Sequence, residues 1–145
     1  MIYNEQPKDF VSDVEVVGCL IECDGKILLL HRHDHKPQGG KWGIPAGKMD
    51  ATDNDRKIAT LRELKEETGL TLNIDDLIYR KTFFVSYPEK NFIYHYYSVN
   101  LKEIPEIILS KTEHKNFSWV TLNEALKMPL IMDEDYCLKD YYGIK

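Results

Sequence analysis

The chain has 145 residues, of which 43% are hydrophobic and 30% charged, so it is long enough to bury the core of one globular domain. Its formal net charge of -5 argues against binding to a nucleic-acid backbone, because that binding is driven by clustered Lys and Arg. Apolar runs such as residues 27–30 are too short to cross a bilayer, and three cysteines without zinc-finger spacing, together with the lack of a signal-like start, favour the cytoplasm.

The first part of the chain predicts a β-hairpin followed by a short strand. Residues 14–23 and 26–32 are rich in β-branched and aliphatic side chains, and the Asp24-Gly25 pair between them is a strong turn signal. Proline and glycine mark residues 33–41 as a loop, and residues 42–45 then resemble a short strand that ends at a proline. We therefore expect an antiparallel hairpin as the first element.

A loop and the best-defined helix of the sequence come next. We expect the loop to run from Ala46 to Asp53 and the helix from Asn54 to Thr68, with Gly69 as its C-terminal stop. The candidate N-cap residues, whose side-chain oxygens can accept hydrogen bonds from the first turn, are Thr52, Asp53 and Asn54.

The second half of the chain predicts another hairpin, a short strand and two helices. Strands are expected at residues 77–87, 92–101 and 117–121, and helices at residues 122–128 and 133–142. Because hairpins and separate helices occur without regular β-α-β alternation, we predict an α+β fold in which helices cover a mixed sheet. Residues 1–145 are expected to form a single domain.

The central helix has an acidic face. Three glutamates share one side of it, and three aliphatic residues share a roughly opposite side that we expect to pack against the core. These are Glu63, Glu66 and Glu67, and Ile58, Leu61 and Leu64. Carboxylates at this spacing repel one another, and a hard divalent cation such as Mg²⁺ would offset the repulsion. The alternative is a solvated acidic surface paired with local basic residues.

The segment of residues 47–70 resembles the signature of the Nudix hydrolase family, G-x5-E-x7-R-E-U-x-E-E-x-G-U, where U is a bulky aliphatic residue. The second half of the segment agrees with the signature at every fixed position. These positions are Arg62, Glu63, Leu64, Glu66, Glu67, Gly69 and Leu70. Residues 42–48 also resemble the tract that commonly precedes the signature. The resemblance implies a Nudix-type α/β/α sandwich.

The first half of the segment departs from the signature. Fourteen residues, 48–61, separate Gly47 from Arg62, where the signature has thirteen. The first signature glutamate is replaced by Asp53 when counted from Gly47, or by Asn54 when counted back from Arg62. Because that glutamate chiefly supports the loop and helix in the family, the resemblance gives Asp53 a supporting role.

The resemblance implies Mg²⁺-dependent hydrolysis of a phosphoanhydride bond, with Mn²⁺ as an alternative ion. Glu63, Glu66 and Glu67 would bind the metal, the carbonyl of Gly47 would join them, and Arg62 would orient the carboxylates. The metal would neutralise phosphate oxygens and lower the pKa of a water that attacks phosphorus.

Three further residues are candidates for the site. Glu113 lies in a segment similar to one near the C-terminus of many Nudix enzymes, where a glutamate is a metal ligand or general base; a surface glutamate is the alternative. Arg32 is expected to edge the substrate pocket, and a zinc or copper site in the alternating histidines of residues 31–35 is the alternative. Tyr87 follows Leu70 at a spacing that resembles dinucleoside-polyphosphate hydrolases, although sheet packing would also explain it.

The expected substrate and partner is a nucleotide. The compact chain favours nucleoside triphosphates over dinucleoside polyphosphates, nucleotide sugars and ADP-ribose. A non-catalytic nucleotide sensor is the competing class because the loop before the helix is altered, but the intact helix glutamates argue against it. For the oligomeric state, the sequence leaves a homodimer as an alternative to a monomer.

Overall fold

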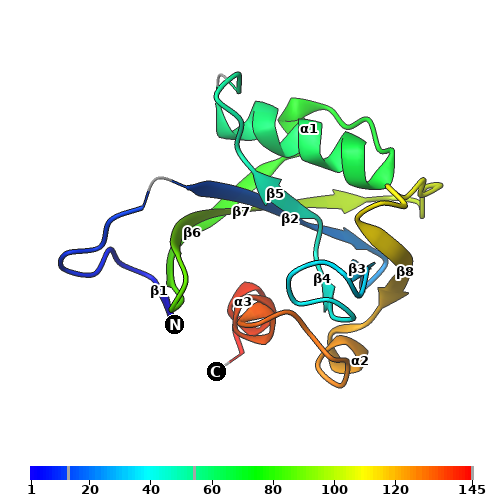
Figure 1. Ribbon diagram of the computed structural model, residues 1–145. Coiled ribbons are helices and arrows are strands. Elements are labelled where there is room, and N and C mark those ends of the chain that lie inside the picture. The colour runs from blue at the N-terminus through cyan, green and yellow to red at the C-terminus, as the bar shows by residue number, and fades with distance from the viewer. Residues whose placement is uncertain (13, 54, 145) are drawn as a thin grey trace.

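The computed structural model describes residues 1–12, 14–53 and 55–144 and shows a mixed sheet between helices (Figure 1). Helix α1 (Arg56–Thr68) covers one face of the sheet, and α2 (Leu122–Ala125) and α3 (Glu134–Tyr141) lie on the other side. The predicted α+β fold with flanking helices is therefore confirmed. Over the ranges described, none of the helices combines the length and apolar character that a membrane span needs.

The strands of the sheet are β1 (Ile2–Tyr3), β2 (Glu15–Cys23), β3 (Lys26–Arg32), β4 (Trp42–Gly43), β5 (Ala46–Lys48), β6 (Ile78–Ser86), β7 (Asn91–Leu101) and β8 (His114–Val120). Their order is β1-β6-β7-β2-β3-β4, with β5 also paired to β2 and β8 to β3. Strands β2 and β7 run parallel, whereas the other pairs are antiparallel. Strand β2 is thus central, and β5, which precedes the acidic helix, lies directly beside it.

The core lies on both faces of β2. Cys19 and Ile21 pack with Leu64 of α1, while Leu20 between them packs with Leu138 of α3. Burial on both faces explains why β2 is a nearly continuous apolar run rather than an alternating one. The position of α1 over the sheet is therefore fixed by the packing of β2.

The structure corrects the predicted start of the helix and the loop before it. Helix α1 begins at Arg56 and its N-cap is Asp55, whose Oδ1 accepts a 2.8 Å hydrogen bond from the Ile58 N–H. The N-cap predictions of Thr52 and Asp53 were therefore wrong, and Asn54 lies outside the described residues. The predicted loop also begins too early, because residues 46–48 pair with β2 as strand β5.

The other predicted elements are present: β3 has its predicted bounds, and the rest differ at one or both ends. Strand β8 begins at His114 rather than Phe117, because pairing with the end of β3 extends it towards the N-terminus. Helix α2 is shorter than predicted and α3 agrees to within one residue at each end. Strand β1 and the 3-10 turn η1 (Ile74–Asp76) were not predicted.

Candidate active site

Helix α1 buries a face that includes one of its glutamates. Thr60, Leu64 and Glu67, spaced i, i+4 and i+7, are all buried, and Glu67 is only 2% exposed. Ile58 lies on the far side of the helix and is 42% exposed. Packing of Leu61 and Leu64 was predicted correctly, but Ile58 is exposed rather than packed, and Glu67 is buried although it belongs to the acidic face that was placed opposite the core. Compared with the predicted packing face, the helix is rotated about its axis so that the Glu67 side chain points towards the interior of the protein.

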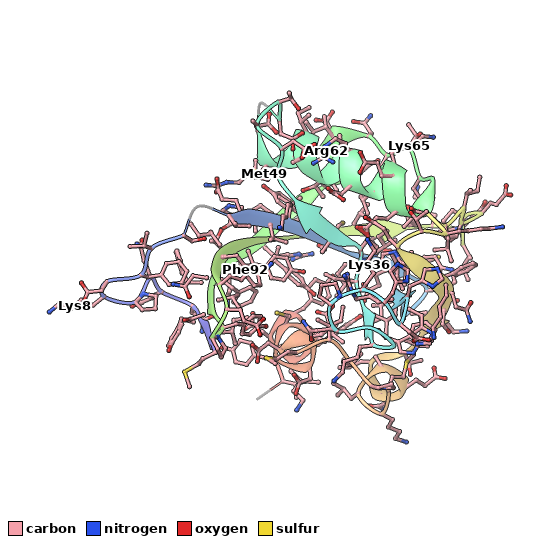
Figure 2. All side chains as sticks on the ribbon, in the orientation of Figure 1. Lys8, Lys36, Met49, Arg62, Lys65 and Phe92 are labelled. Atoms are coloured by element: carbon pink, nitrogen blue, oxygen red, sulfur yellow. The ribbon has the colours of Figure 1, made fainter. Side chains whose placement is uncertain are left out.

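Arg62 lies on α1 (Figure 2), and its hydrogen bonds connect the loop before the helix to two of the helix glutamates. Its guanidinium donates to both carboxylate oxygens of Asp53, over 3.1 and 2.9 Å, and to the Lys48 carbonyl over 3.1 Å. It also donates to Glu63 over 3.0 Å and to Glu66 over 3.2 Å. The two glutamates are therefore held in place by an arginine that is itself anchored to the loop.

Asp53 closes the altered loop in a turn. Its Oδ2 accepts a 2.7 Å hydrogen bond from the Asp50 N–H, and its own N–H donates to the Asp50 carbonyl over 3.0 Å. The Asp53 side chain is 4% exposed, and its hydrogen bonds with Arg62 hold its pKa below the usual value. The position that departs from the family signature thus binds Arg62 through both of its oxygens.

Gly47 lies in β5 directly against Glu63. A Cβ atom at this position would overlap the Glu63 carboxylate, so glycine leaves the space that the carboxylate occupies. Glu63 is partly buried, and burial raises its pKa while the charge of Arg62 lowers it. The structure therefore brings together the backbone of Gly47 and the carboxylate of Glu63.

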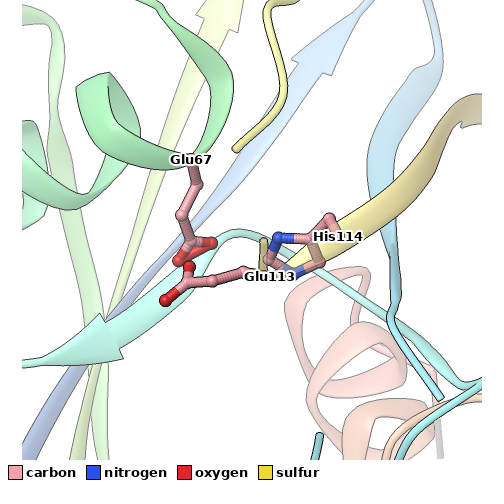
Figure 3. Close-up of side chains that lie close together, drawn as sticks. All are labelled: Glu67, Glu113 and His114. Carbon is pink, nitrogen blue, oxygen red and sulfur yellow. The ribbon is translucent and has the colours of Figure 1, made fainter. Parts of the chain in front are cut away.

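A second group of side chains meets beside the end of α1 (Figure 3). Single ligand atoms of Glu67, Glu113 and His114 all lie within 4.8 Å of one another, and we call these residues the carboxylate–histidine cluster. Glu113 is accessible to solvent, whereas Glu67 and His114 are 2% and 5% exposed. Within the part of the chain that is described, Glu67 Oε2 and His114 Nδ1 have no hydrogen-bond partner.

The electrostatics of the carboxylate–histidine cluster follow from this burial. Burial raises the pKa of Glu67 well above its usual value, and the nearby charges of Glu63 and Glu113 raise it further. Burial, followed by the charge of Arg32, lowers the pKa of His114 to about 4. A buried carboxylate with a free oxygen, next to a second carboxylate, is the environment that a divalent cation would stabilise.

The backbone fixes Glu113 next to α1. The Ser110 N–H donates to the Glu67 carbonyl over 3.3 Å, and the Glu113 and His114 N–H groups donate back to the Ser110 carbonyl. On the other side, the His33 N–H donates to the Glu113 carbonyl over 3.1 Å. Sequence reasoning had found Glu113 but missed His114, because its position directly after Glu113 was the only signal in the sequence.

Arg32 and Tyr87 lie in different places. Arg32 donates to the Pro37 carbonyl over 2.9 Å and pairs with His114 between β3 and β8, so it lies near the carboxylate–histidine cluster. Tyr87 packs in the core cluster shared with α3, and its hydroxyl donates to Asp133 Oδ2 over 3.1 Å. Tyr87 is thus placed on the side of the sheet opposite to α1.

Comparison with known protein families identifies the class of the protein. The family model described as "NUDIX domain" matches residues 12–141. Over 117 residues the chain is 32% identical to the CTP pyrophosphohydrolase of Escherichia coli (strain K12), covering 81% of this chain and 82% of that protein. The chain belongs to the Nudix family and is a Nudix hydrolase.

Solved structures agree on the fold. The fold is similar to that of the NUDIX domain of Shewanella oneidensis NrtR complexed with ADP ribose, with a TM-score of 0.79, 22% identity and coverage of 97% of this chain and 93% of that one. It is also similar to a C. elegans Ap4A hydrolase binary complex, with a TM-score of 0.72, 25% identity and coverage of 90% and 96%. The Nudix fold expected from the sequence is therefore confirmed.

Proposed function

We propose that this Nudix hydrolase uses Mg²⁺ to hydrolyse a phosphoanhydride bond in a nucleoside diphosphate derivative, and that nucleoside triphosphates are its favoured substrates. The observation that carries the proposal is the buried Glu67 carboxylate, which keeps an oxygen without a partner among the described residues and lies close to Glu113. An isolated buried carboxylate is unfavourable unless a cation or a proton neutralises it. The acidic site therefore fits a divalent metal ion.

Four groups from neighbouring elements would hold the metal. They are the carboxylates of Glu63, Glu66 and Glu67 on α1 and the carbonyl of Gly47 on β5. When bound, Mg²⁺ (or Mn²⁺, the alternative) would neutralise phosphate oxygens and lower the pKa of the attacking water. Arg62 already orients the carboxylates of Glu63 and Glu66, so binding of the metal requires less loss of side-chain entropy.

Glu113 and Arg32 complete the proposed site. Glu113 is accessible to solvent and adjacent to Glu67, so its carboxylate can accept the proton of a water that attacks phosphorus. Arg32 lies near enough to influence the pKa of Glu67, and its positive charge would attract the phosphates of a substrate. These roles rest on position and charge.

The choice of substrate is supported by the relatives. The favoured class, nucleoside triphosphates, agrees with the CTP named for the Escherichia coli relative. Dinucleoside polyphosphates are the second candidate, because Tyr87 has the spacing noted above and the C. elegans structure is an Ap4A hydrolase. Since the Tyr87 hydroxyl is already bonded to Asp133, a base would meet its ring rather than its hydroxyl. Nucleotide sugars and ADP-ribose are further alternatives.

One experiment tests both the reaction and the substrate class. The protein is incubated with Mg²⁺ and separate nucleoside triphosphates, dinucleoside polyphosphates, nucleotide sugars or ADP-ribose, and the products are identified by chromatography. We expect cleavage of a phosphoanhydride bond, and a loss of at least about 100-fold in turnover for Glu67→Gln, because this variant removes a charge from the site at nearly constant shape.

Glu89→Gln is the matched control, since it makes the same chemical change at an exposed turn. It should keep wild-type turnover. Equal turnover in wild type and Glu67→Gln would remove Glu67 from the mechanism. Tight nucleotide binding without turnover on any compound would instead favour the nucleotide sensor.

A further inference from the structure

The carboxylate–histidine cluster contains a nitrogen atom that the oxygen-ligand site described above does not use. His114 is the first residue of β8, and its ring lies beside the carboxylates of Glu67 and Glu113 (Figure 3). It is 5% exposed, so water does not readily satisfy its polar atoms. Within residues 1–12, 14–53 and 55–144, its Nδ1 atom accepts or donates no hydrogen bond.

Two side chains of this cluster, from separate elements, each carry a buried polar atom without a partner among the described residues. Glu67 Oε2 belongs to α1 and His114 Nδ1 to β8, and neither is bonded within the described ranges. Buried polar atoms in folded proteins nearly always have a partner, because leaving them unpaired is costly. Two such atoms in one group of three neighbouring side chains indicate that an external ligand belongs to this cluster.

The chemistry of the three side chains indicates which ligand fits. Two carboxylates favour a cation, and the imidazole ring offers a nitrogen atom as a further metal ligand. Mg²⁺ strongly prefers oxygen ligands, whereas first-row transition ions also bind imidazole nitrogen. The spread of the three ligand atoms, all within 4.8 Å of one another, suits a single ion that touches each of them.

We infer that His114 supplies a ring nitrogen to a divalent transition ion, such as Mn²⁺, bound between Glu67 and Glu113, and that this ligand shifts the preference of the site from Mg²⁺ towards such ions. The inference rests on the proposed function, in which Glu67 binds a cation. It adds a nitrogen ligand and a metal preference to that function. If His114 only fills space beside Glu113, the metal would be bound by oxygen atoms alone.

Pulsed electron paramagnetic resonance can detect the nitrogen directly. Metal-free protein is titrated with Mn²⁺ in the absence of nucleotide, and the spectrum is examined for coupling between the ion and ¹⁴N. We expect this coupling in the wild type and its loss in His114→Gln. The affinity for Mn²⁺ should fall by about tenfold or more in that variant. The affinity for Mg²⁺ should change little.

His35→Gln is the control for histidine content, because His35 is exposed and its ring stacks on that of His33 rather than belonging to the carboxylate–histidine cluster. It should keep both the ¹⁴N coupling and the affinity for Mn²⁺. Circular dichroism and thermal melting check that His114→Gln is folded. If the variant is not folded, long-range ¹H–¹⁵N spectra of the wild type are recorded instead. Coordination of Zn²⁺ should then change the ¹⁵N chemical shift of a ring nitrogen of His114.

The outcomes separate this inference from the proposed function. Mn²⁺ binding without ¹⁴N coupling, coupling that persists in His114→Gln, or unshifted His114 nitrogens would overturn the inference and leave the proposed function intact. A wild type that binds no Mn²⁺ would likewise overturn the inference alone. If Glu67→Gln binds Mn²⁺ as tightly as the wild type, the metal role of Glu67 fails and both proposals fall.

Discussion

Asp53 binds Arg62 from a loop that departs from the family signature. The family signature has a glutamate near this position, and the loop here is one residue longer. The shorter aspartate reaches Arg62 because the turn with Asp50 brings it close, and both of its oxygens accept from the guanidinium. Asp53 was predicted as a supporting residue from its place in the sequence. Its contact with Arg62 depends on the path of the longer loop.

We predict that Asp53→Asn lowers metal-dependent turnover by about tenfold without changing the overall fold. The substitution removes the charge that pairs with Arg62, so the guanidinium can move and Glu63 and Glu66 lose their fixed position. Steady-state kinetics at several Mg²⁺ concentrations measure the effect. Higher Mg²⁺ should recover part of the turnover.

Asp50→Asn is the control for this prediction. Asp50 also contacts Arg62, at 3.5 Å, but its side chain is 59% exposed, and exposed ion pairs contribute little. Asp50→Asn should therefore keep nearly normal turnover. Equal losses in the two variants would show that the net charge around Arg62, rather than the Asp53 contact, determines activity.

Helix α1 was predicted well as a helix, but the side of it that packs against the protein was predicted less well. The spacing of its residues gave the acidic face, but the rotation of the helix is set by what lies beneath it. Strand β5 lies against Glu63, and the turn at residues 110–113 is bonded to the Glu67 carbonyl; neither could be placed beside α1 from the sequence. Strand β5 itself, Ala-Gly-Lys, has weak intrinsic strand preference and forms because β2 offers a partner.

The N-cap of α1 gives a prediction for this element. Asp55→Ala removes the side chain that accepts from the Ile58 N–H, and we expect the free energy of unfolding to fall by about 1 kcal/mol. Urea unfolding followed by circular dichroism measures it. Asp55→Ser, which keeps an accepting oxygen, should lose much less. Equal losses in the two variants would mean that the charge of Asp55, and not the cap, stabilises the helix.

The sequence predicted the layers of the fold but not the pairing of strands at the centre of the sheet. The order of hairpins and helices indicated a mixed sheet with flanking helices. The parallel pairing of β2 with β7, which sets Glu15 opposite Ile93 and Cys23 opposite Leu101, joins segments about half the chain apart. Strand preference is a local property and carries no information on such a distant partner.

One buried contact links the C-terminal part of the molecule to the strands before α1. Glu134, the first residue of α3, accepts a 2.7 Å hydrogen bond from the Ile44 N–H, between β4 and β5. The chain just before it is bonded to β4 as well, since the Ile131 N–H donates to the Trp42 carbonyl over 2.9 Å. Glu134 is only 7% exposed, and burial raises its pKa to about 7.

This pKa makes the stability of the whole molecule depend on pH. Between the ordinary glutamate value of 4.5 and about 7, the folded protein keeps the Glu134 proton while the unfolded chain has released it, so this contribution to stability falls as the pH rises. Glu134→Gln cannot ionise and keeps an oxygen for the Ile44 N–H. We therefore expect the variant to match the wild type near pH 4.5 and to exceed it in free energy of unfolding above pH 7, by up to about 3 kcal/mol.

Urea unfolding of both proteins from pH 4.5 to 8, in the presence of EDTA, tests this dependence. Glu89→Gln removes the same charge at an exposed turn and controls for the overall charge of the molecule. A stability difference between Glu134→Gln and wild type that stays constant with pH would mean that Glu134 ionises alike in the folded and unfolded chains. A difference that grows up to about pH 7 and then levels off would show that a buried carboxyl group, shared by α3 and the strand connection, is held protonated by the fold.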